Sequence, residues 1–201
     1  MNSSDHRVFL IAGLGNPGLR YENTRHNIGF MVIERWAEVL GIRLSGRAFS
    51  ARSGRARLGE QEIILLCPQT YMNESGRSVR SCAGFYRIET ENILAVHDDL
   101  DIELGRIKVV KNGGGGGHKG VLSMFQHLGS QAFNRVKIGV GRPRYDEPVD
   151  EFVLRPFYRD EERIVEKVLK GAVHACELFV SRGIVQAMNI INPQDFADKE
   201  E

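Results

Sequence analysis

The sequence has no apolar run that approaches the ~20 residues needed to span a bilayer, so we expect no membrane segment. Its first residues, 1–7, are polar and lack the apolar stretch of a signal peptide. It also lacks an internal repeat of about 20–50 residues and a long linker rich in proline or glycine. These absences predict a soluble protein of the cytoplasm and exclude repeat architectures and transmembrane proteins.

Cysteine is scarce as well. Cys67, Cys82 and Cys176 are odd in number, scattered along the chain and set among apolar neighbours. This pattern favours buried free thiols in a reducing compartment over a disulfide framework. A cysteine nucleophile is the alternative, but no motif lies near any of the three.

Length and periodicity bound the fold. The 201 residues, of which 42% are hydrophobic, suit one domain over 1–201, with frayed tails expected over 1–6 and 197–201. Short apolar runs predict strands over 8–12, 63–67 and 93–96, and alternating polar and apolar residues predict half-exposed strands over 106–111 and 135–140. Helical spacing predicts helices over 27–40, 76–86, 121–128, 160–182 and 185–191. This alternation predicts a single three-layer αβα domain with a mixed, mostly parallel, twisted sheet. No exposed apolar stripe demands a partner, so we expect a monomer.

Charge is balanced in total but segregated along the chain. The formal net charge is +1, yet no Asp or Glu lies between Gly105 and Tyr145. The basic residues of that stretch are Arg106, Lys108, Lys111, Lys119, Arg135, Lys137, Arg142 and Arg144. A second acid-free stretch contains Arg43, Arg47, Arg52, Arg55 and Arg57. Such segregation favours a surface that follows a phosphate backbone, and a solvated basic face without a partner is the alternative.

Polar side chains follow the predicted strands. Asn16 and His26 come after the first strand, Asn73 after the second, Asp98 ends the third, and His118 follows the fourth. Because ligands of open α/β sheets bind beyond the carboxyl ends of the strands, we expect these side chains to share one crevice. A His–Asp pair without a Ser or Cys partner predicts a base that activates water. The two carboxamides supply the hydrogen-bonding groups that acyl-transfer hydrolysis requires.

Three other features compete with this interpretation. Gly13, Gly15 and Gly18 match a dinucleotide-binding fingerprint, but Pro17 interrupts it and the following helix begins late. The run 113–117 predicts either a plain connector or a loop that approaches a phosphate closely.

A metal cluster is the third competitor. Its candidate ligands are His97, Asp98, Asp99 and Asp101, joined by His26 and His118. Strand alternation argues against it, because neighbouring residues of a strand point to opposite faces.

Several segments together resemble the bacterial peptidyl-tRNA hydrolase family. They are GLGNPGLRYENTRHNIGF, PQTYMNESG, HDDLD, the glycine-rich loop with HKG, and RVKIGVGRP followed by VDEFVL. The resemblance spans nearly the whole chain in the family's order. It implies a monomeric α/β enzyme that releases the peptide from peptidyl-tRNA without a metal or cofactor, so that tRNA from stalled or aborted translation is recycled. The partner that it implies is the acceptor stem and 3′ end of the tRNA.

The resemblance also implies roles for single residues. His26 is similar to the family's general base, Asp98 to the partner of that base, and Asn16 to the residue that separates blocked from free aminoacyl esters. Contacts to substrate or tRNA are implied for Tyr21, Tyr71, Met72, Asn73, His118, Lys119 and Lys137. Lys119 departs from the family's usual Asn, and Gly115 stands where many members have His. An RNA-binding relative without hydrolysis is the alternative, against which the intact set of Asn16, His26, Asn73 and Asp98 speaks.

Overall fold

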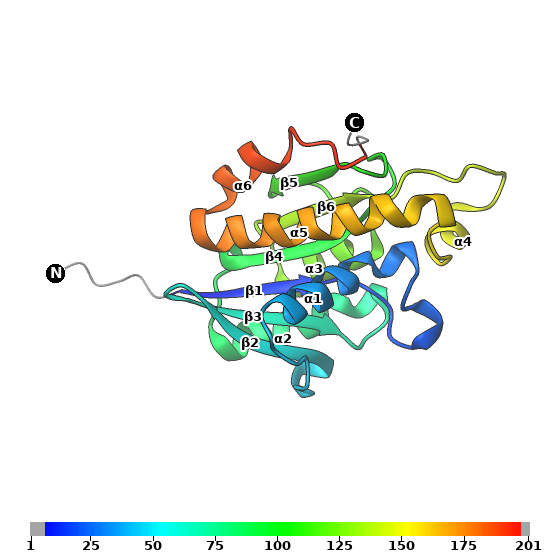
Figure 1. Ribbon diagram of the computed structural model, residues 1–201. Helices are drawn as coiled ribbons and strands as arrows, with labels where there is room; N and C mark the ends of the chain where they lie inside the picture. The colour runs from blue at the N-terminus through cyan, green and yellow to red at the C-terminus, as the bar shows by residue number, and fades with distance from the viewer. Residues whose placement is uncertain (1–6, 198–201) are drawn as a thin grey trace.

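The sheet forms around β1 (Val8–Gly13), whose residues are apolar on both faces and almost all buried. The computed structural model describes residues 7–197 and places six strands in the order β2-β3-β1-β4-β6-β5 (Figure 1). The other strands are β2 (Ala51–Leu58), β3 (Gln61–Pro68), β4 (Ile93–Asp99), β5 (Ile107–Lys111) and β6 (Asn134–Gly139). The four central strands are parallel and both edge strands are antiparallel to their neighbours, which confirms the predicted mixed sheet. The sequence analysis missed β2.

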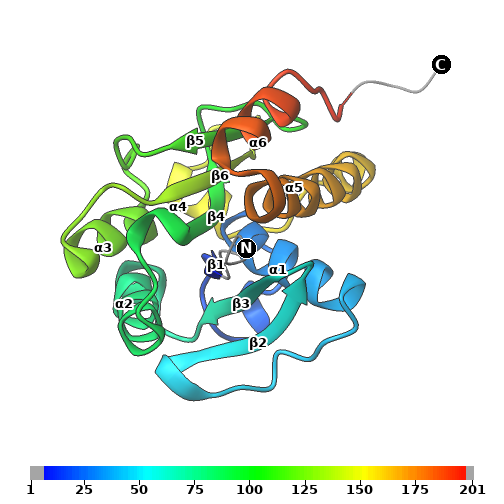
Figure 2. The ribbon, with the colours of Figure 1, turned by 90° about the vertical axis from the view of Figure 1, so that its left-hand side faces the viewer.

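Helices cover both faces of the sheet, as Figure 2 shows. On one face lie α1 (Ile28–Val39), α5 (Glu162–Arg182) and α6 (Ile184–Ile191), and on the other lie α2 (Ser75–Tyr86) and α3 (Lys119–Leu128). Strand alternation divides the core accordingly: Phe9 and Ile11 pack toward the first group, and Leu10 and Ala12 toward the second. The predicted three-layer αβα architecture is confirmed.

All three cysteines are free and buried, as the sequence predicted. Burial raises the pKa of each thiol, to about 12 for Cys82. Because the thiolate is the nucleophilic form, this burial disfavours the alternative of a cysteine nucleophile.

One predicted connection is wrong. We expected the fourth predicted strand to end beside the crevice, but β5 runs antiparallel to β6 and ends at the opposite, amino edge of the parallel strands. Residues 113–117 therefore cross back to the carboxyl edge, where His118 caps α3. The buried Arg135 guanidinium fixes the beginning of this crossing by donating to the carbonyl oxygens of Asn112 and Gly114, each at 2.9 Å.

The ends of the chain bear on two further expectations. Residues 1–6 and 198–201, which make up most of the expected frayed tails, lie outside the described residues. Ala197 is described, and its N–H donates to Asp195 Oδ1 at 2.9 Å. Among residues 7–197, no helix combines the length and the apolar character that crossing a membrane requires.

Two glycines bring α1 onto the ends of β1 and β4. A Cβ on Gly29 would lie 2.3 Å from the carbonyl oxygen of Val96 and 2.5 Å from the amide nitrogen of Leu14. A Cβ on Gly13 would lie 2.2 Å from the carbonyl oxygen of Gly29. This close approach also accounts for part of the glycine fingerprint seen in the sequence, because the first glycine serves backbone packing.

We therefore expect Gly29→Ala to lower the free energy of unfolding by about 1–3 kcal/mol, because the added methyl group meets immobile backbone atoms. The measurement is urea denaturation followed by circular dichroism. Gly84 in α2 provides the control, since no heavy atom lies within 4 Å of its virtual Cβ. Gly84→Ala should stabilise by about 0.5–1 kcal/mol, and a Gly29→Ala protein as stable as wild type would contradict the packing account.

Candidate active site

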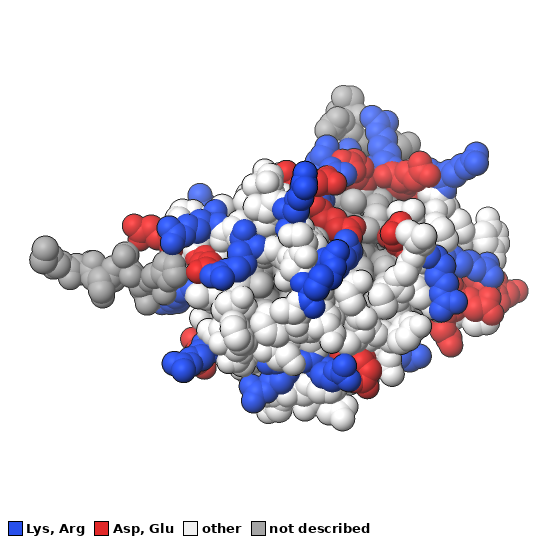
Figure 3. Space-filling view, turned by 90° about the horizontal axis from the view of Figure 1, so that it is seen from below, with Lys and Arg blue, Asp and Glu red and all other residues white. Residues whose placement is uncertain are grey.

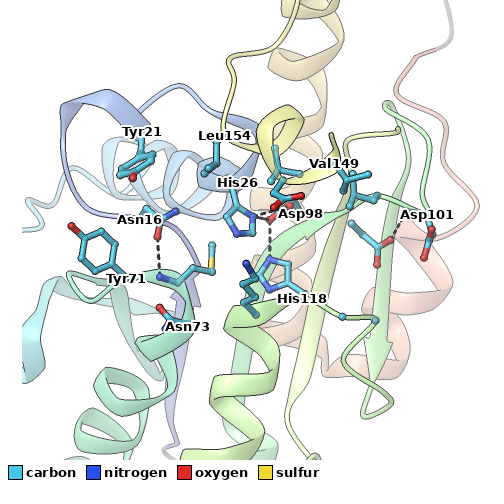
Figure 4. A pocket seen from close by; sticks show the side chains of 18 of the residues that line it. Asn16, Tyr21, His26, Tyr71, Asn73, Asp98, Asp101, His118, Val149 and Leu154 are labelled. Atoms are coloured by element: carbon cyan, nitrogen blue, oxygen red, sulfur yellow. Dashed lines mark hydrogen bonds and ion pairs between the residues drawn. The ribbon is translucent and has the colours of Figure 1, made fainter. Parts of the chain in front are cut away.

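A cavity of about 970 Å³ opens at the carboxyl edge of the parallel strands (Figure 4). This volume lies near the upper end of ordinary ligand pockets, which run from about 300 to about 1,000 Å³. All but one of the predicted site residues line it: Asn16, Tyr21, His26, Tyr71, Met72, Asn73, Asp98, His118 and Lys119. Lys137 is not among the lining residues, and its Nζ lies 2.6 Å from Asp99 Oδ2.

The centre of the site is the carboxylate of Asp98, which ends β4 and is 3% exposed. His26 Nδ1 lies 3.0 Å from both of its oxygens, and His118 Nε2 lies 2.9 Å from Oδ1. Burial alone would raise the pKa of Asp98, but the positive charges of His118 and His26 when both rings are protonated, together with their hydrogen bonds, outweigh it and hold that pKa well below its usual range. Asp98 is therefore an ionised carboxylate between two imidazole rings.

These contacts determine where the histidine protons lie. An ionised carboxylate only accepts hydrogen bonds, so His26 Nδ1 and His118 Nε2 must each carry a proton. His118 Nδ1 fits this assignment, because it accepts from the backbone N–H of Val121 at 3.3 Å. His26 Nε2 then carries a lone pair, and within residues 7–197 it has no hydrogen-bond partner. His26 thus offers a basic nitrogen at the cavity.

The residue after His26 ties it to the loop that follows β1. His26 lies in a single 3-10 turn (Arg25–Asn27) directly before α1, as the sequence predicted. The Asn27 side chain accepts from the backbone N–H of Asn16 at 2.8 Å and donates to its carbonyl oxygen at 2.9 Å. This pair of bonds fixes the position of Asn16 relative to His26.

The residue before His26 ties it to the far wall of the cavity. Arg25 is fully buried, donates to Glu161 Oε2 at 2.9 Å and to the Pro156 carbonyl oxygen at 2.6 Å, and stacks 4.0 Å from the Phe152 ring centroid. The sequence analysis missed both Arg25 and Asn27. The only signal was a polar Thr-Arg-His-Asn run before a helix, which does not distinguish buried residues from exposed ones.

The amide of Asn16 has a defined orientation. Its Oδ1 accepts from the backbone N–H of Met72 at 2.9 Å, so its Nδ2 protons remain available toward the cavity. Tyr21 and Tyr71 lie on the same side of the cavity, and Tyr71 is 58% exposed (Figure 4). Asn73 is exposed nearby. This side therefore combines a directed donor with aromatic surface.

Most of the remaining lining mixes charged and apolar side chains. The charged ones are Asp99, Asp101, Arg142 and Asp150. The apolar ones, which the sequence analysis did not predict, are Leu100, after β4, and Val149, Val153 and Leu154, in or directly after α4 (Val149–Val153). A helix of five residues is too short for periodicity to reveal it.

Most candidate ligands of the alternative metal cluster have other partners. Asp99 pairs with Lys137 and Asp101 with Arg142, while buried His97 has Nδ1 2.7 Å from the carbonyl oxygen of Asp98. Burial and the neighbouring His118 hold the pKa of His97 well below its usual value. Among residues 7–197, the group that could hold an ion consists of His26, Asp98 and His118, whose ligand atoms lie within 4.8 Å of one another. Hydrogen bonds already join these atoms, so an ion would have to displace two protons.

Many residues of the two basic stretches form ion pairs and are therefore less available to a phosphate backbone. Four of the basic residues between 105 and 145 contact carboxylates, and Arg135 is buried: the paired ones are Arg106, Lys137, Arg142 and Arg144. In the second stretch Arg52 pairs with Glu34 and Arg55 with Glu62. Lys108, Lys111 and Lys119 are exposed and have no carboxylate partner within the described part of the chain.

The low pKa of Asp98 predicts a pH dependence of stability. An unfolded Asp titrates near pH ~3.9, and the folded pKa lies below that value. The ionised group therefore contributes stability that is present above about pH 4 and is lost as the pH falls through the folded pKa. We expect the difference in unfolding free energy between wild type and Asp98→Asn, measured by urea denaturation, to shrink below about pH 4.

Asp146→Asn is the control for this measurement, because it removes one exposed carboxylate without touching the site. Its stability curve should run parallel to that of wild type. A difference between wild type and Asp98→Asn that stays constant down to about pH 3 would contradict the assignment.

Comparison with known proteins agrees with this geometry. The peptidyl-tRNA hydrolase family model matches residues 10–199. A peptidyl-tRNA hydrolase of Clostridium botulinum is 45% identical over 185 residues, covering 92% of this chain and 97% of that protein. One from a Geobacter species is 44% identical over 183 residues, covering 91% of this chain and 97% of that protein. The crystal structure of peptidyl-tRNA hydrolase from Acinetobacter baumannii superposes with a TM-score of 0.89 at 38% identity, covering 96% of this chain and 100% of that one. The chain therefore belongs to the peptidyl-tRNA hydrolase family, enzymes that hydrolyse the ester bond between a peptide and its tRNA.

Proposed function

We propose that His26 is the general base of peptidyl-tRNA hydrolysis and that the nucleophile is a water molecule at its Nε2. The observation that carries the proposal is the contact of His26 Nδ1 with both oxygens of Asp98, which leaves Nε2 as the free basic nitrogen. Nε2 takes a proton from water while the water oxygen attacks the ester carbonyl carbon. Buried, ionised Asp98 stabilises the imidazolium that forms.

The reaction is completed by breaking the bond between the carbonyl carbon and the ribose 3′ oxygen. The proton on His26 Nε2 passes to that oxygen, so the products are the peptide acid and a tRNA with a free 3′ hydroxyl. His26 ends the cycle in the neutral form in which it began. No step requires a metal ion or a cofactor.

Asn16 distinguishes the substrate in this proposal. Because Met72 N–H occupies Oδ1, only the Nδ2 protons face the substrate, and they donate to the carbonyl oxygen of the last peptide bond. A free aminoacyl ester lacks that oxygen and presents an ammonium group, which gains nothing from a donor. Lys119 at the cavity and Lys108 and Lys111 outside it supply positive charge for the phosphates of the acceptor and T stems.

We expect His26→Ala to slow peptide release from an N-acetyl-aminoacyl-tRNA by about 10²–10⁴-fold, because general-base catalysis is lost. His174→Ala, an exposed histidine on α5, is the matched control and should retain the wild-type rate. The assay is run with and without excess chelator. Peptide release by His26→Ala at the wild-type rate would refute the role of His26. Release that is sensitive to the chelator would indicate a metal-dependent mechanism. RNA binding by the wild type without any release would indicate a binding module.

Asn16 allows a near-isosteric test. Asn16→Asp keeps an oxygen for Met72 N–H but replaces the donor toward the substrate by an acceptor. We expect kcat/KM for the blocked substrate to fall by about 10–100-fold, and the preference for blocked over free aminoacyl-tRNA to fall with it. Asn16→Ala should lose activity without gaining activity on the free ester. An Asp variant with unchanged preference would refute the proposed donor role.

A further inference from the structure

The solvent face of α2 is basic and begins at the cavity. The helix follows directly on the turn Met72–Glu74, which contains Asn73 of the cavity lining. Arg77, Arg80 and Arg87 are all exposed, and the spacing of 77, 80, 84 and 87 keeps these positions on one side of the helix. At 1.5 Å per residue, the row from Arg77 to Arg87 extends for about 15 Å away from the cavity.

The positive charge of these arginines is not balanced by nearby carboxylates within the described residues. No acidic residue lies between Glu74 and Glu89, and none of the three arginines has a carboxylate partner among residues 7–197. Gly84 lies in the middle of the row, and no heavy atom lies within 4 Å of its virtual Cβ, so no other side chain covers the helix at this position. Figure 3, seen from the side of β2 and α2, shows blue side chains separated by white surface along its lower margin, where red is sparse.

Two further observations point to a ligand. Arg87 takes the left-handed conformation at the end of α2, with φ 53° and ψ 44°, where glycine is the favoured residue. An arginine held there against backbone strain is more consistent with a functional side chain than with a structural one. Phe85, beside it, is 70% exposed and offers an aromatic surface of the kind on which nucleobases stack.

We infer that Arg77, Arg80 and Arg87 bind successive phosphates of the tRNA backbone outside the cavity. The inference rests on the proposed function for the identity of the RNA, and it adds a contact surface on α2 that the charge runs in the sequence did not indicate. The guanidinium groups hold phosphates without reading the base sequence. The surface positions the RNA so that its 3′ end enters beside Asn73.

The test is the binding of deacylated tRNA, followed by fluorescence anisotropy over a range of KCl concentrations. The variant is Arg77→Gln/Arg80→Gln/Arg87→Gln. The matched control is Arg159→Gln/Arg163→Gln/Arg182→Gln, which removes three exposed arginines without a carboxylate partner in the described residues. Two of these lie on α5, across the sheet, and α5 also carries Glu162, Glu166 and Glu177.

We expect the α2 variant to bind at least tenfold more weakly at low salt. Its log Kd against log[KCl] should be shallower by about two to three, since each lost phosphate contact removes about 0.7–0.9 from the slope. The control should stay close to wild type. Wild-type slope in the α2 variant, or an equal loss in the control, would overturn the inference.

Two measurements separate this inference from the proposed function. His26→Ala should bind deacylated tRNA like wild type, and the α2 variant should raise KM for blocked aminoacyl-tRNA while leaving kcat unchanged. Arg87→Gly adds a readout of opposite sign, because relief of backbone strain should raise Tm while tRNA binding weakens. Lower Tm together with unchanged binding would assign Arg87 a purely structural role.

Discussion

The site depends on one buried carboxylate that accepts hydrogen bonds from two imidazoles. Protonation of Asp98 would turn one of its two accepting oxygens into an O–H group and weaken its contacts with His26 and His118, and the carboxylate is ionised at 3% exposure because these two donors offset its burial. The three groups therefore fix one another's protonation. The helix α3 adds the final constraint, because the Val121 N–H takes the remaining lone pair of His118. Only His26 retains a free basic nitrogen, and the functional asymmetry between the two histidines follows from this contact.

Hydrogen bonds of the two residues beside His26 position the rest of the cavity. Asn27 and Arg25 flank His26 and connect it in opposite directions, to the loop of Asn16 and to the segment around Glu161. One side of the cavity thus presents a directed amide with two tyrosines, and α4 adds the apolar side chains of Val149 and Val153 together with the charged Asp150. Ion pairs occupy several of the predicted cations, Lys137 among them, whereas Arg77, Arg80 and Arg87 on or at the end of α2 and Lys108, Lys111 and Lys119 have no carboxylate partner among residues 7–197. The polar chemistry and the proposed RNA contacts are consequently carried by different elements.

Apolar runs and strand ends in the sequence predicted the central strands, the three layers and five polar residues of the cavity, Asn16, His26, Asn73, Asp98 and His118; the resemblance added Tyr21, Tyr71, Met72 and Lys119. They failed where the outcome depends on partners distant in the chain. The half-exposed, arginine-rich β2 has no alternating apolar face, and the direction of β5 follows from its pairing with β6. Arg25 and Glu161 are 136 residues apart, so no local pattern marks them as a pair. The arginines of α2 are spaced by the helical period, and a search for charge runs along the chain does not find them.

The most direct test of the central claim is the tautomeric state of the two histidines, measured by ¹⁵N NMR of the imidazole rings at neutral pH. The account predicts His26 with its proton on Nδ1 and a bare Nε2, and His118 with its proton on Nε2 and a bare Nδ1. Proton transfer to Asp98, or a His26 ring protonated on Nε2 alone, would contradict it.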